Sequence, residues 1–334
     1  MRFRKINRKT ILIILLTVFI IILFLYQLCY KSLFIAKMVM GGKFYNQTFA
    51  NEEYKINNEK IDVEKYFRPS DLPVLNDKNL NIVISYYYGK EYSEINLPDT
   101  LFKTPENSII NYFSLLREAA NPQKGKSAGC GTLGQAKLPY PVAYNFLTTD
   151  CQEKLSYDRY LKTFENILHI NLLKLKEVPT YNENSDNLRY FVEIETIEGS
   201  EKDVVYFAYY YGFIDLIKEE NKYLITNSEF YGENYLCAPY HGWSYDAETN
   251  VSIRYGNWCP LIKEMYPTEI KDFVKNVSFK GTDGNDYLIV FYQLTNDTDI
   301  EIAQYIKSEG QDWKLINLNP EKCLEKSEYW RERK

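Results

Sequence analysis

The stretch CAPYHGWSYDAETNVSIRYGNWC, residues 237–259, contains side chains whose types and spacing could do chemistry. It holds two cysteines, one of the two histidines in the 334-residue chain, and two of its four tryptophans. Three kinds of site use such residues: a metal centre, a cysteine nucleophile with a histidine base, and a loop closed by a disulfide.

The spacing favours the disulfide. Cys237, His241 and Cys259 supply three metal ligands, whereas a structural zinc site needs four and usually contains a close Cys-x-x-Cys pair. Pro239 disfavours the helix that would bring Cys237 beside His241, and Asp246 could orient the imidazole only if the loop folds back. A disulfide needs only two cysteines whose Cα atoms lie within about 7 Å. We therefore expect a Cys237–Cys259 disulfide or buried thiols here, and no metal site.

Five side chains are candidate ligand contacts. His241 and Trp243 belong to the same loop, and His169 lies between a predicted helix and a predicted strand. Tyr209 and Tyr211 share one face of a predicted strand, where they could stack on sugars or peptides or could simply cover the sheet. His169 could face a cavity or play a structural part.

Acid–base chemistry has no convincing pair in this sequence. Glu193 and Glu195 lie on one strand face about 7 Å apart. Arg189 shares that face and indicates a solvated surface. We therefore predict no catalytic residue and no cofactor, and whether the chain is an enzyme stays open.

Composition limits the possible partners. The chain has 40 basic and 45 acidic residues, which argues against a nucleic-acid binder held by phosphate contacts. Of its six cysteines, only Cys29 lies in the apolar N-terminal segment. The other five could form disulfides in an oxidising compartment, where an odd count leaves at least one thiol free or paired with another chain.

The N-terminus predicts a membrane anchor. Residues 1–9, MRFRKINRK, are basic, and Thr10–Tyr30 carries no charge over a length that can span a bilayer. The basic tail should stay in the cytoplasm, which places the rest of the chain outside. A cleaved signal peptide is the alternative, but KSLFIAKMVMGG offers no small-x-small cleavage site. We therefore expect a single-pass protein of the cell membrane whose first partner is the lipid bilayer.

Helical patterns precede strand patterns along the rest of the chain. Residues 31–103 are predicted to be a stalk with at least one docking strand, at 79–89. Thr104 and Pro105 start an amphipathic helix, and two shorter helices follow at 141–148 and 156–168. Period-two alternation then predicts four antiparallel strands, at 169–178, 188–196, 202–217 and 222–232. This order indicates an α+β domain over 104–232, with a curled sheet against three helices.

The segments SIINYFSLL, AYNFLT, SYDRYLKTFENI and NKYLITNSEF are similar to the nuclear-transport-factor-two-like superfamily of cone-shaped α+β domains. The resemblance covers residues 104–232. It implies a cone-shaped fold that serves binding widely, and it carries over no active site, because no invariant catalytic residue defines that superfamily.

Residues 233–334 should be rich in β structure. Three strand patterns after residue 284 are split by TNDTD and SEGQD, and residues 260–275 have helical stretches broken at Pro267. This region is either a reduced second copy of the fold or a continuation of the first sheet. Two such domains behind one membrane helix resemble, in architecture only, the anchored subunits of Gram-positive conjugation channels.

These observations lead to two expectations for function. The first is a non-catalytic binding or assembly module of the cell envelope, presented outside the cell to other envelope proteins or to a second copy of itself. The second is an anchored enzyme of hydrolase type that uses the cone as its pocket. A buried polar cavity that holds His169 with an acid within hydrogen-bond reach would favour the enzyme. A cavity filled by aromatic side chains, with an exposed apolar patch elsewhere, would favour binding.

Overall fold

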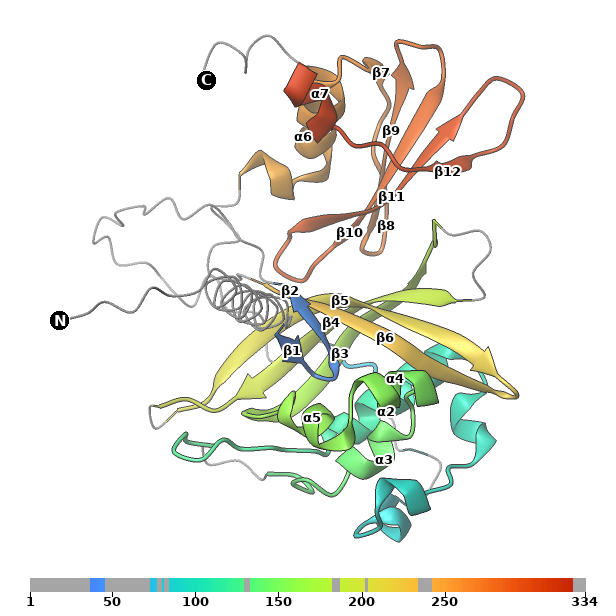
Figure 1. The fold of residues 1–334 in the computed structure, drawn as a ribbon. Helices are drawn as coiled ribbons and strands as arrows, with labels where there is room; N and C mark the ends of the chain where they lie inside the picture. The colour runs from blue at the N-terminus through green and yellow to red at the C-terminus, as the bar shows by residue number, and fades with distance from the viewer. Residues whose placement is uncertain are drawn as a thin grey trace, which may run out of the picture.

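The computed structural model describes residues 37–45, 73–76, 80, 84–128, 133–181, 187–201, 204–233 and 242–326. These residues form two β-sheets and a few short helices, so the predicted α+β class is confirmed (Figure 1). The predicted membrane helix at 10–30 lies outside the described residues. Within the described ranges, no helix is long and apolar enough to cross a membrane.

Helix α2 of the first unit begins at the predicted capping residue. The Thr104 side chain accepts a hydrogen bond from the Asn107 amide at the start of α2, and Pro105 is the first helical residue. Thr148 caps a short helix that the sequence patterns did not predict, by accepting from the Cys151 amide. The helices of this unit are η2 (Ile84–Tyr87), η3 (Tyr92–Glu94), η4 (Asp99–Phe102), α2 (Pro105–Arg117), α3 (Tyr140–Tyr144), α4 (Thr149–Lys154) and α5 (Tyr157–Lys162).

Four long strands form the body of the first sheet: β3 (Ile167–Val178), β4 (Leu188–Glu198), β5 (Tyr206–Glu219) and β6 (Lys222–Gly232). Consecutive strands pair antiparallel, as predicted. One face, which we call the inner face, packs against α2–α5 through Ile170, Leu172 and Ile194. The space between the inner face and the helices is filled by buried aromatic rings: Tyr112, Phe113, Tyr140, Tyr144, Phe146, Tyr160 and Phe164.

Two short strands from the predicted stalk complete this sheet. Strands β1 (Met38–Val39) and β2 (Gly42–Tyr45) form a hairpin, and β2 pairs parallel to β6, which gives the order β1-β2-β6-β5-β4-β3. A Cβ atom on Gly42 would lie 2.7 Å from the Ser228 carbonyl oxygen, so this close approach requires glycine. The strand expected at 79–89 is not formed at Ile84–Tyr87, which is a 3-10 helix.

The second sheet is separate from the first, so the proposed continuation of the first sheet is wrong. Its antiparallel order is β12-β11-β10-β9-β7, and β8 pairs with β9. The strands are β7 (Ile262–Met265), β8 (Glu269–Lys271), β9 (Val274–Gly281), β10 (Asp286–Gln293), β11 (Asp299–Lys307) and β12 (Lys314–Ile316). Helices α6 (Ala247–Val251), the π-helix η7 (Ser252–Trp258) and α7 (Glu321–Lys326) belong to the same unit.

The helical stretches expected within residues 260–275 are wrong. Ile262 and Met265 are spaced as on a helix face, but both pair with β9, opposite Gly281 and Phe279. After Pro267, Asp272 adopts a φ of 55° and closes the turn between β8 and β9. Pairing with a long neighbouring strand therefore outweighs the weak local helical pattern.

The two sheets meet in a third hydrophobic cluster. The second face of the first sheet, which we call the outer face, contributes Phe191 and Tyr211, and the tip of the β10–β11 hairpin contributes Tyr292 and Leu294. The Tyr292 hydroxyl donates to the Glu177 carbonyl at 3.1 Å. In Figure 1 the second sheet accordingly stands on the outer face, and the helices α2–α5 lie on the opposite side of the first sheet.

Candidate functional site

The outer face of the first sheet brings together two of the predicted site residues, His169 and Tyr209. Asn171 on β3, Glu195 on β4 and Tyr209 on β5 are direct neighbours across three strands. His169 Nε2 lies 3.0 Å from Asn171 Oδ1, and Asn171 Nδ2 donates to Glu195 Oε1 at 2.9 Å. The Tyr209 hydroxyl donates to Glu195 Oε2 at 2.9 Å. We call these four residues the outer-face row.

The outer-face row does not place the histidine against the acid. The Asn171 amide bonds to both side chains and holds them apart, and an amide does not relay protons as a carboxyl–imidazole pair does. Both Glu195 oxygens already accept hydrogen bonds, and the residue is only 3% exposed. The geometry therefore fits a network that fixes three strands in register better than it fits an acid–base site.

The solvated face expected at Glu193 and Glu195 is wrong, because both carboxylates are buried. Glu193 Oε2 lies 2.9 Å from the Lys174 ammonium, and Glu193 Oε1 accepts from the Thr295 amide at 2.8 Å. Thr295 follows β10, so the second sheet covers this carboxylate. The alternating pattern of one strand does not show that a second sheet covers this face, so no sequence signal indicates that Glu193 is buried.

Tyr209 and Tyr211 are buried as well, with 4% and 6% of their surfaces exposed. The Tyr211 ring stacks on Tyr231 with centroids 5.0 Å apart, and Tyr231 stacks on Tyr45 at 5.2 Å. The rings thus contact one another across β5, β6 and β2. Of these three stacked rings only Tyr45 is exposed, at 38%, so the packing reading of Tyr209 and Tyr211 fits the structure better than ligand stacking.

Trp243 stays accessible in the second unit. Its side chain is 38% exposed and packs edge-on against Trp258, with ring centroids 5.4 Å apart. A ligand contact at Trp243 therefore stays a prediction. Its predicted companion His241 lies outside the described residues, as does Cys237. Among the described residues, no three His, Cys, Asp or Glu side chains group closely enough to hold a metal ion.

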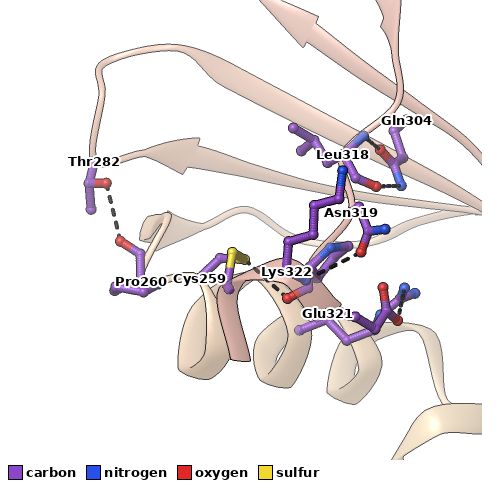
Figure 2. Close-up of a disulfide and its surroundings, with 11 residues drawn as sticks. Cys259, Pro260, Thr282, Gln304, Leu318, Asn319, Glu321 and Lys322 are labelled. Carbon is purple, nitrogen blue, oxygen red and sulfur yellow. Dashed lines mark hydrogen bonds and ion pairs between the residues drawn. A yellow bond between two sulfur atoms is a disulfide. The ribbon is translucent and has the colours of Figure 1, made fainter. Parts of the chain in front are cut away.

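The predicted Cys237–Cys259 disulfide is corrected by the structure, in which Cys259 pairs with Cys323. Their Cα atoms lie 5.2 Å apart across a sequence separation of 64 residues. The bond joins the end of η7 to α7 (Figure 2). Cys323 is the one other cysteine of the C-terminal region, but sequence spacing alone does not select it over the nearer Cys237.

The disulfide lines a small, open apolar pocket of about 220 Å³ together with Tyr255, Leu261, Leu318, Asn319 and Pro320. Two polar contacts hold the C-terminal segment beside it. The Gln304 side-chain amide exchanges hydrogen bonds with both backbone groups of Leu318 (Figure 2). Arg254 bridges Glu301 at 2.7 Å and Glu321 at 2.8 Å. These contacts fix the last strand and α7 onto the second unit.

His169 should make the stability of the fold depend on pH. Burial lowers the pKa of His169 and the charge of Arg117 lowers it further, which together outweigh the raising effects of Asn171 and Glu118. An unfolded histidine has a pKa of about 6.5, so between that value and the lower folded pKa the unfolded chain binds more protons than the folded chain. The free energy of unfolding should therefore keep its full value above about pH 7. It should decrease as the pH falls from about 6.5 toward the lower pKa of the folded His169.

Urea unfolding at pH 7.5 and pH 5.5 measures this effect. We expect the wild-type midpoint to fall between the two values, and we expect His169→Gln to remove part of the fall. His241→Gln is the matched control, because it removes the other histidine and should retain the full decrease. A His169→Gln variant with the same decrease as wild type would show that this histidine is not responsible.

Comparison with protein families, with curated proteins and with solved structures finds no significant match to this chain.

Proposed function

We propose that this chain is a single-pass membrane protein that presents a non-catalytic binding or assembly module outside the cytoplasm. The anchor is the uncharged segment Thr10–Tyr30, and the basic residues before it remain on the cytoplasmic side. The module comprises the two sheets. Its partners are other proteins of the cell envelope or further copies of the chain.

The Cys259–Cys323 disulfide is the observation that carries this proposal. Disulfides form and persist in oxidising compartments and are rare in the cytosol. A disulfide in the second unit therefore supports the orientation that the basic tail predicts independently, with the region after residue 30 outside. Cys151, which is free in the structure and partly buried on α4, is compatible with the same location.

The interior of the first unit supports binding over catalysis. Aromatic rings fill the space between the inner face and the helices, and the Tyr112 and Tyr160 hydroxyls satisfy each other at 3.1 Å. His169 lies on strand β3 in the outer-face row, where its partner is an amide. An interior filled by aromatic side chains, together with exposed apolar side chains such as Leu138 and Val204, supports a module that binds through its surface.

The order of elements is compatible with a cone-shaped α+β domain followed by a reduced copy. In the first unit, helices precede the consecutive antiparallel strands β3–β6. In the second unit, α6 and η7 precede the consecutive strands β9–β12. This shared order supports the proposed likeness, in architecture, to anchored subunits of conjugation channels.

The topology is tested by treating intact cells with protease. The chain from Lys31 onward should be degraded, while a cytoplasmic marker protein remains intact. An alkylating reagent added before lysis should leave Cys259 and Cys323 unlabelled, because these two cysteines are already bonded to each other. Full protection from the protease, or release of the full-length chain into the medium, would refute the proposed anchor and orientation.

A further inference from the structure

The register of the first sheet shows from which side the chain enters the folded domain. Phe44 pairs with Phe230 near the end of β6, and the Phe44 amide donates to the Lys37 carbonyl. Because β1 runs antiparallel to β2, Lys37 lies at the end of β1 that is nearer to where β6 finishes and β5 begins. The connection between β4 and β5 lies at this same end, on the left in Figure 1.

We propose that this end of the first sheet rests on the bilayer that anchors the chain, with apolar side chains inserted among the lipid headgroups. We call it the membrane-facing end and define it by residues 121–126, 133–138, 199–201 and 204–206. This inference rests on the proposed membrane anchor. It adds which surface of the module the lipid contacts.

Backbone hydrogen bonds gather these three segments at one place. The Ala120 amide donates to the Ala136 carbonyl, and the Asn121 amide donates to the Ile167 carbonyl at the start of β3. Ser127 then pairs with Ser200 in an isolated antiparallel bridge, with the Ser127 amide 2.8 Å from the Ser200 carbonyl. Segments that are distant in sequence therefore form one continuous surface.

The exposed side chains at this surface suit a lipid interface. Val204 is 59% exposed, Tyr206 44%, Leu138 43% and Leu133 36%. Of the four large aliphatic side chains exposed in the described part of the chain, three lie here and only Ile270 lies elsewhere.

The polar neighbours of these apolar side chains fit the same partner. Among the described residues of these three segments, Lys124 and Lys137 are exposed, as is the acid Glu201. Tyrosine and lysine with apolar neighbours are the side chains that settle at the boundary between lipid and water.

The segment between the predicted membrane helix and the first sheet is long enough for this surface to reach the bilayer. The predicted membrane helix ends at Tyr30, so seven residue steps reach Lys37, and a fully extended chain spans at most about 25 Å over that distance. Lys37 hydrogen-bonds to Phe44, which pairs with Phe230, which in turn pairs with Gly212 of β5. Lys37 and Gly212 therefore lie at about the same height along the sheet. Tyr206 is six residues further along β5, or about 20 Å beyond that level toward the membrane. The tether therefore allows the tip of the sheet to touch the headgroups.

Quenching by brominated lipid tests the contact in the full-length chain. Tyr206→Trp places a reporter at the membrane-facing end, and Glu219→Trp places the matched control at the exposed far end of β5, about 43 Å away by strand geometry. Both variants and the wild type are reconstituted in phosphatidylcholine vesicles with and without bromine on the acyl chains. The wild-type emission is subtracted, and circular dichroism checks that each variant folds.

We expect brominated lipid to remove about half of the emission that Tyr206→Trp adds, because interfacial rings lie at headgroup level near the acyl chains. Glu219→Trp should lose almost none. Flotation of the vesicles separates the two proposals. If the wild-type chain does not float with lipid, the membrane anchor and this inference both fail. If the chain floats but Tyr206→Trp is quenched no more than Glu219→Trp, the anchor stands and the membrane-facing end is refuted.

Discussion

Replacing both Cys259 and Cys323 with serine should lower the free energy of unfolding by about 4 kcal/mol. The bond links residues 64 positions apart, and the chain-entropy model gives roughly this value for a closed loop of that length. The loop contains β7–β12, so the whole second sheet forms inside it. Without the bond, the unfolded chain regains the freedom that the closed loop removes.

Urea unfolding of the double variant beside the wild type measures this loss. Cys151→Ser is the matched control, because Cys151 is free and its substitution removes a cysteine without removing a disulfide. Peptide mapping without reduction identifies the bonded pair. A map in which Cys259 is joined to Cys237 would contradict the structure, and a double variant as stable as the control would show that the bond contributes nothing.

Hydrogen bonds and ion pairs around the disulfide should keep the second unit folded in the double variant. Gln304 holds Leu318 from both sides, and Arg254 links Glu301 to Glu321. These contacts position α7 in the folded state, whereas the disulfide acts mainly by restricting the unfolded chain. We therefore expect a lower urea midpoint with an unchanged near-ultraviolet spectrum under native conditions.

Local signals in the sequence predict the start of α2 and the four long strands of the first unit. Thr104 and Pro105 fix the start of α2 through chemistry confined to one turn, and the alternation at 188–196 with its neighbouring apolar segments indicates β3–β6. The strands β10–β12 follow the predicted divisions at TNDTD and SEGQD for the same reason. Such features depend on residues close in sequence, so a single chain suffices to find them.

What the sequence failed to predict depends on contacts between distant residues. The partner of Cys259 lies 64 residues away, and β7 becomes a strand because β9 pairs with it. The alternating pattern of the strand assigns Glu193 to a solvated face, and only the packing of the β10–β11 hairpin on the outer face buries it. The outer-face row has the same origin, since Asn171 and Glu195 meet only when two strands take the observed register.

Glu193→Ala should lower the free energy of unfolding by about 3–5 kcal/mol, because it breaks a buried charge pair from one side. Glu193 has no exposed surface, and its partner Lys174 has a side chain only 15% exposed, so the ammonium would lose its counter-charge in a place that water reaches poorly. The Thr295 amide and hydroxyl, which both donate to Glu193 Oε1, would lose their acceptor as well. The same side chain joins the two sheets, so its loss should loosen their junction.

A double-mutant cycle in urea shows whether the unpaired charge causes this cost. Lys174→Met removes the partner, and adding it to Glu193→Ala should recover part of the loss, because no buried ammonium then lacks its counter-charge. Asp150→Asn is the matched control: its ion pair with Lys154 is more than two-thirds exposed on both sides, and such pairs contribute about 0–1 kcal/mol. If Glu193→Ala costs no more than Asp150→Asn, then Glu193 does not hold the two sheets together. If Lys174→Met deepens the loss instead of relieving it, then the lysine stem and its contact with the Gln293 carbonyl matter more than its charge.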